Sequence, residues 1–120
     1  MKHAVKFAAA ALACCTSAVF GQALGKSPIT FVSPFPPGGG TDTLTRMVAN
    51  AVAADKQWNI VVENKPGAGG NLALDSVARS APDGRTLVMA QTDNIVLNPW
   101  LYKKLNYDTF KDFKPVALIA

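Results

Sequence analysis

The chain has 120 residues, of which 49% are hydrophobic and 17% are charged, and its formal net charge is +4. This composition is that of a globular protein and excludes a disordered or fibrous chain. The basic excess is mild and scattered, so the clustered basic face of a nucleic-acid-binding protein is missing and we expect no nucleic-acid partner.

Residues 1–23 have the three-part pattern of a secretory signal peptide. Basic residues precede an apolar, alanine-rich stretch from Phe7 to Phe20, and Gly21-Gln22-Ala23 supplies small residues for cleavage. As a helix this stretch rises about 21 Å, too little for a hydrocarbon core of about 30 Å. We therefore predict export to the periplasm and a mature chain of residues 24–120.

Cysteine and histidine occur only in this predicted signal peptide, as Cys14, Cys15 and His3. Lipidation at Cys14 is disfavoured because Ala11 stands where a lipoprotein signal has leucine. The mature chain therefore offers no disulfide, no thiolate metal site and no Ser-His or Cys-His nucleophile pair. We expect no catalytic residue, no metal and no other cofactor.

Strand and helix patterns alternate along the mature chain. Apolar runs predict strands at 29–32, 60–62 and 86–90. The first helix has one apolar face, formed by Leu44, Met47, Val48, Ala51 and Val52. The buried side of a second helix, which ends near Ser80, is formed by Leu74, Val77 and Ala78. A short helical stretch follows the third strand and runs toward Tyr102.

This alternation predicts an α/β fold with an open, mostly parallel sheet and helices on both faces. The apolar run 116–120 predicts the start of a fourth strand. A buried parallel strand needs neighbours and a crossover connection. We therefore expect the sequence to be the N-terminal part of a longer protein.

Three polar loops follow the three predicted strands: FPPGGGTD (35–42), KPGAGGN (65–71) and QTDN (91–94). Loops at the carboxyl ends of parallel strands meet at one edge of the sheet, so we expect these three to converge. The first two place glycines directly before a helix, where free N–H groups and the helix dipole favour an anion.

Other interpretations of the glycine loops remain open. Neither loop has the lysine of a GxxxxGK[ST] phosphate loop or the spacing of GxGxxG, which argues against nucleotide binding. The glycines can serve tight turns alone, and Thr41, Asp42 or Asn71 can cap the helices. Asp42 would repel an anion unless its carboxylate turns to helix N–H groups or to a ligand ammonium. The aromatic residues are expected to pack rather than to stack on a ligand: Trp58, Trp100, Tyr102 and Phe113.

The blocks ITFVSPFPPGGGTDTLTRMVA, VVENKPGAGGN, VARSAPDGRTLVMA and NPWLYKKLNYDTFKDFKPVALIA occur in this order. In sequence and spacing they resemble the extracytoplasmic solute receptors of the tripartite tricarboxylate transporters, the Bug family. The resemblance implies a periplasmic binding protein with two α/β domains of the type II arrangement, of which this chain holds the N-terminal part. It also implies a small carboxylic or amino acid ligand and membrane permease subunits as partners.

In that family the two glycine loops hold the ligand carboxylate through backbone groups and ordered waters. Carried over to this chain, the resemblance implies ligand contacts at Phe35, Pro37, Gly38, Gly39, Gly40, Thr41 and Asp42, at Gly67, Ala68, Gly69, Gly70 and Asn71, and at Thr92 in the third loop.

The sequence departs from the family pattern at Leu74, where glycine is common, and at Asn106, where proline is usual. The acidic Asp93 in the third loop disfavours a polycarboxylate such as citrate and favours an amphoteric or neutral-tailed acid. The alternative to a receptor is a secreted α/β enzyme that uses the glycine loops as an oxyanion site.

Overall fold

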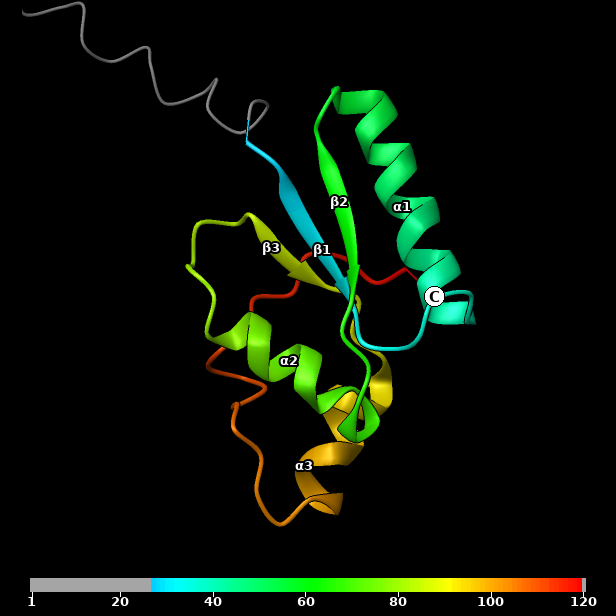
Figure 1. The fold of residues 1–120 in the computed structure, drawn as a ribbon. Helices are drawn as coiled ribbons and strands as arrows, with labels where there is room; N and C mark the ends of the chain where they lie inside the picture. Colours follow the sequence, from blue (N-terminus) through cyan, green and yellow to red (C-terminus); the bar gives the residue numbers. More distant parts are fainter. Residues whose placement is uncertain (1–26, 120) are drawn as a thin grey trace, which may run out of the picture.

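The structure is a computed structural model that describes residues 27–119 (Figure 1). Three parallel strands form its sheet: β1 (Ile29–Ser33), β2 (Ile60–Asn64) and β3 (Thr86–Val88). They lie in the order β2-β1-β3, with β1 in the centre. The predicted parallel α/β fold is confirmed, whereas the predicted signal peptide lies outside the described residues.

Helical segments follow each strand (Figure 1). The first is α1 (Gly40–Lys56), and β2 is followed by a 3-10 turn, η1 (Ala68–Gly70), and by α2 (Asn71–Ala78). After β3 the chain forms a π-helical turn, η2 (Asp93–Leu97), and the short α3 (Asn98–Leu101). No helix within residues 27–119 is long and apolar enough to cross a membrane.

The strand order fixes where the helices lie. The chain steps from β1 to β2 and then returns past β1 to β3. Because crossovers between parallel strands are right-handed, these two opposite steps place α1 and α2 on opposite faces of the sheet. The order also makes β1 and β3 a topological switch point, and ligands of open α/β proteins bind beside the carboxyl ends of such strands.

The core lies around the central strand. Val32 of β1 and Leu74 of α2 are fully buried, and Ile29 and Phe31 are also buried. Neighbours in register point to the same side of a parallel sheet, so Phe31 shares its face with Val62 of β2. As predicted, Leu74 belongs to the buried side of the second helix.

The packing of α1 differs from what its apolar pattern suggests. Leu44 and Met47 are exposed, and the face against the sheet carries Thr41, Thr45 and Ala49. Small side chains on this face permit a close approach of helix and sheet. The buried hydroxyl of Thr45 donates to the carbonyl oxygen of Thr41 at 2.7 Å, so its burial leaves no unpaired donor.

The segment 116–119 forms no strand, so the predicted fourth strand is wrong for these residues. Val116 is 80% exposed and Leu118 94% exposed. A strand needs a neighbour that pairs with its backbone, and no described strand pairs with this segment. Trp100 is 88% exposed, so the expected packing of its ring is also not seen among the described residues.

Candidate functional site

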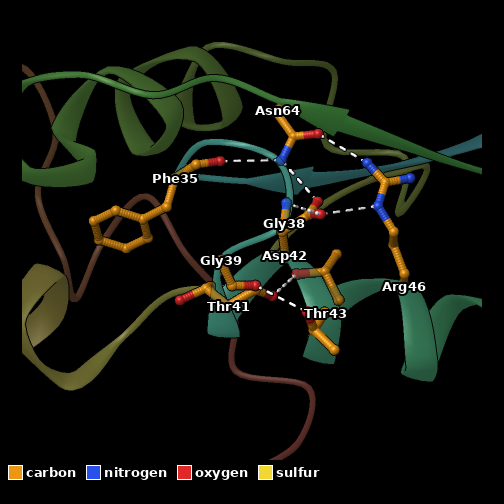
Figure 2. A network of polar contacts seen from close by, with 9 residues as sticks. Phe35, Gly38, Gly39, Thr41, Asp42, Thr43, Arg46 and Asn64 are labelled. Atoms are coloured by element: carbon orange, nitrogen blue, oxygen red, sulfur yellow. Dashed lines mark hydrogen bonds and ion pairs between the residues drawn. The ribbon is translucent and has the colours of Figure 1, made fainter.

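The three polar loops converge at the carboxyl edge of the sheet, as predicted. The Gln91 side chain donates to the hydroxyl oxygen of Thr41 at 2.6 Å, which joins the third loop to the first. The Asn94 side chain donates to the carbonyl oxygen of Gly69 at 2.6 Å, which joins the third loop to the second. Asn64 donates to the carbonyl oxygen of Phe35 at 3.0 Å and so connects the end of β2 with the first loop (Figure 2).

The N-terminus of α1 opens at this edge. Gly39 is its N-cap residue and makes no side-chain cap, and the first backbone bond of the helix runs from the Thr43 amide to the Gly39 carbonyl. Within the described chain, the amide groups of Gly40, Thr41 and Asp42 have no hydrogen-bond acceptor. Such free N–H groups, at the positive end of the helix dipole, form a site that an anion can occupy.

The carboxylate of Asp42 is turned into the protein (Figure 2). One oxygen accepts hydrogen bonds from the Gly38 amide at 2.9 Å and from Arg46 Nε at 3.0 Å, and the other accepts from Asn64 at 2.8 Å. The bond from Arg46, with those from Gly38 and Asn64, lowers the pKa of Asp42 to about 2. Asp42 therefore holds the first loop in place, and Arg46 compensates its charge.

The glycines of the two loops divide into two groups. Gly38, Gly67, Gly69 and Gly70 have positive φ angles, so their backbone conformation itself favours glycine. At Gly69 a Cβ atom would also lie 2.8 Å from the Tyr102 hydroxyl oxygen. Gly39 has an ordinary φ of −75°, and a Cβ there would meet only the Pro36 carbonyl oxygen, at 3.5 Å.

Gly40 is similar, because a Cβ atom there would meet nothing within 4 Å and its φ lies outside the left-handed region. Neither turn geometry nor packing among the described residues requires glycine at 39 or 40. Both positions are exposed beside the free N–H groups of α1. A bound molecule can therefore approach the backbone closely at these two positions.

The side chain of Asn71 lies in a buried network. Its oxygen accepts from Asn98 at 2.6 Å and from the Tyr107 hydroxyl at 2.8 Å. The N-cap of α2 is Gly70, so Asn71 does not cap the helix. Its nitrogen is buried and has no partner in the described chain. The Asn71 oxygen therefore braces the second loop from inside the protein.

The remaining predicted residues lie at the rim. Pro37, Ala68 and Thr92 are exposed, and Phe35 is half-buried. The sequence analysis placed Gln91 and Asn94 in the third converging loop, but it gave a linking role to none of the residues that join the loops: Asn64, Gln91, Asn94, Asn98 and Tyr107. Their one signal in the sequence is a polar residue at or just after a strand end, which applies to Asn64 and Gln91. Within residues 27–119, no three His, Cys, Asp or Glu side chains cluster as metal ligands.

The class of protein is defined by a family comparison. Residues 44–120 match the model of the family described as tripartite tricarboxylate transporter family receptor. This match covers more than half of the chain. The chain therefore belongs to that family of solute receptors, and the resemblance seen in its sequence is confirmed.

Individual relatives agree with this assignment. A UPF0065 protein from Pseudomonas sp. strain P51 is 36% identical over 113 residues, which cover 92% of this chain and 33% of the relative. Protein BugT of Bordetella pertussis is 34% identical over 94 residues, or 78% of this chain and 29% of BugT.

Among solved structures, MatC from Rhodopseudomonas palustris with bound malate matches with a TM-score of 0.72 and 43% identity, over 76% of this chain and 31% of MatC. A second R. palustris protein, with adipate, matches with a TM-score of 0.65 and 32% identity, over 71% of this chain and 29% of its own. This chain spans about a third of the length of the curated relatives it matches.

Proposed function

We propose that this chain forms one side of the ligand site of a periplasmic solute receptor. The receptor captures a small carboxylic or amino acid and delivers it to the membrane permease subunits of a tripartite transporter. Residues 24–120 then are the N-terminal part of a receptor with two α/β domains, released after removal of residues 1–23. The family membership and the two ligand-bound structural neighbours support this proposal.

One observation carries the choice of a carboxylate. The free amides of Gly40, Thr41 and Asp42 lie at the start of α1, beside two glycines whose conformation and packing do not require glycine. A carboxylate accepts hydrogen bonds from such donors and gains from the helix dipole. The Asp42 carboxylate does not compete for these amides, because its oxygens already accept from Gly38, Arg46 and Asn64.

Gly39→Ala tests the proposal. The variant is made in the protein as it is encoded, with any in-frame sequence that follows codon 120. It is titrated calorimetrically with malate, succinate, adipate and aspartate. An added methyl group at Gly39 fits the fold, and we expect it to displace a carboxylate from the α1 amides. Loss of one charge-assisted hydrogen bond, worth about 1.5 to 3 kcal/mol, weakens binding by roughly tenfold to a hundredfold.

Ala51→Ser is the matched control, because Ala51 is an exposed residue farther along α1. We expect this variant to bind like the wild type, and both variants to melt near the wild-type temperature. Unchanged affinity in Gly39→Ala would refute a carboxylate site at the start of α1. Conversion of a bound acid into a product would instead favour the enzyme alternative, which none of the comparisons supports.

A further inference from the structure

Gln91 is fixed at the switch point between β1 and β3. Its amide nitrogen in the backbone donates to the Asn94 side-chain oxygen at 3.1 Å, and Asn94 is fully buried. Its side-chain nitrogen donates to Thr41 Oγ1 at 2.6 Å. The side chain is exposed, although both ends of the residue are anchored.

The Thr41 hydroxyl has a single proton to donate. Thr41 is in the first turn of α1, next to the free amides, and its hydroxyl donates to no described acceptor. Without a ligand, this hydrogen bond can have either direction. Gln91 can donate to Thr41, or the Gln91 amide can be turned over so that Thr41 donates to Gln91. A carboxylate bound at the start of α1 accepts the hydroxyl proton, and this removes the second arrangement.

Once Thr41 donates to the ligand, Gln91 keeps its contact with Thr41 only by donating through its nitrogen. The Gln91 side-chain oxygen then points away from Thr41, and no described donor satisfies it. An amide oxygen accepts hydrogen bonds only. Binding of a carboxylate therefore fixes the Gln91 oxygen as a free acceptor next to the bound group.

We propose that Gln91 is a specificity-determining residue that selects acids carrying a hydrogen-bond donor, a hydroxyl or an ammonium group, close to the carboxylate. This inference rests on the proposed carboxylate site at α1. A plain acid leaves the Gln91 oxygen facing an apolar CH2 group, whereas a 2-hydroxy or 2-amino acid pairs with it. The exposed Asp93, two residues farther along, has no ion pair within residues 27–119 and suits an ammonium group as well.

Matched pairs of acids test the inference by calorimetric titration of the protein with any in-frame sequence after codon 120. Malate and succinate differ by one hydroxyl group, as do 2-hydroxybutanoate and butanoate; aspartate and succinate differ by an ammonium group. In each pair that binds, we expect the wild type to bind the donor-bearing acid about tenfold more tightly, the usual worth of one well-placed hydrogen bond.

Gln91→Met keeps the length of the side chain and removes its amide. We expect this variant to bring the affinity ratio of each pair close to one, mainly by weakening the donor-bearing acid. Asn50→Met is the matched control, because Asn50 is exposed on α1 and makes no side-chain hydrogen bond to the loops within residues 27–119, and its ratio should equal that of the wild type.

The outcomes separate the two proposals. Equal affinities within the pairs for the wild type, or a ratio that survives in Gln91→Met, overturn the role of Gln91 and leave the carboxylate site standing. Failure of every acid to bind overturns the carboxylate site itself, and the role of Gln91 with it.

Discussion

Asn64, the last residue of β2, donates to the carboxylate of Asp42 in α1 at 2.8 Å. The same nitrogen donates to the Phe35 carbonyl oxygen at 3.0 Å, and the Asn64 oxygen accepts from Arg46 at 2.9 Å (Figure 2). One amide thus connects a strand end, the first glycine loop and α1. The loop that offers the free amides is held by side chains from two neighbouring elements, and the ligand is not needed to shape it.

Asn64→Leu should therefore destabilise the protein. The substitution leaves the Phe35 carbonyl and one Asp42 oxygen without this donor, and an unsatisfied polar group costs about 1 to 3 kcal/mol. Urea unfolding measures the loss. Glu63→Gln is the control, because Glu63 makes only an exposed ion pair with Lys65 at 3.4 Å, worth at most about 1 kcal/mol. Equal stability of the two variants would contradict the role given to Asn64.

Asp42 should make the protein sensitive to acid. Its pKa is about 2 in the folded protein, against an ordinary value of 3.8. A lowered pKa contributes stability that is present above the ordinary value and is lost as the pH falls through the folded value. We therefore expect the free energy of unfolding to decrease between about pH 4 and pH 2.

Asp42→Asn should be less stable at pH 7 and should show a weaker dependence on pH in this window, measured by urea unfolding at a series of pH values. Some dependence remains, because the bond from Lys111 and the Phe110 amide lower the pKa of Asp108 as well. An acid dependence as steep as that of the wild type would show that another carboxylate dominates.

Much of this architecture is predictable from the sequence because its signals are local. The apolar runs give the three strands, and strand order in the chain places their loops at one edge. The face of α1 was not predictable in this way. Thr41 and Thr45 pack on the sheet while Met47 is exposed, since close packing of small side chains, and not hydrophobicity, decides which face approaches the sheet.

The linking residues of the site were also beyond local reasoning. Tyr107 reaches Asn71 across 36 positions of sequence, and Gln91 reaches Thr41 across 50. Contacts at such separation depend on how the loops meet in three dimensions. The glycine loops were recognisable in the sequence. The φ angles and the space around each glycine were needed to separate Gly39 and Gly40 from the glycines that have positive φ angles.

Gly39→Ala and Gly69→Ala should differ in stability. Gly69 has a φ of +63° and a Cβ atom there would lie 2.8 Å from the Tyr102 hydroxyl oxygen. A left-handed conformation costs a non-glycine residue roughly 1 to 2 kcal/mol. Gly39→Ala should unfold within about 0.5 kcal/mol of the wild type, because alanine fits its conformation.

Thermal or urea unfolding of both variants measures this difference. Tyr102→Phe in the Gly69→Ala background should recover part of the loss, since it removes the atom closest to the added methyl group. A Gly69→Ala variant as stable as the wild type would contradict the left-handed conformation of Gly69 in the second loop.

If the protein is exported, its N-terminal signal peptide should be removed. The signal-peptide pattern places cleavage after Ala23, so periplasmic protein should begin at or near Leu24. Mass spectrometry of a periplasmic extract measures the mature mass. An Ala23→Pro substitution should block processing, because small residues are needed at the cleavage site, and intact Met1 on a cytoplasmic protein would exclude export.

Tyr107→Phe should loosen the second loop from the inside. The Tyr107 hydroxyl contacts the Asn71 oxygen at 2.8 Å and the Asn94 carbonyl oxygen at 3.0 Å, and it is buried. Its removal leaves the Asn94 carbonyl without this donor, whereas Asn71 keeps the bond from Asn98. The ring itself still fits, since it packs edge-on against Phe113 with centroids 5.7 Å apart. We expect a loss of about 1 to 3 kcal/mol in the free energy of unfolding.

Tyr102→Phe is the matched control, because the Tyr102 hydroxyl makes no hydrogen bond within residues 27–119 and its loss should cost little. Equal unfolding midpoints in urea for the two variants would show that the buried network around Asn71 does not hold the loop.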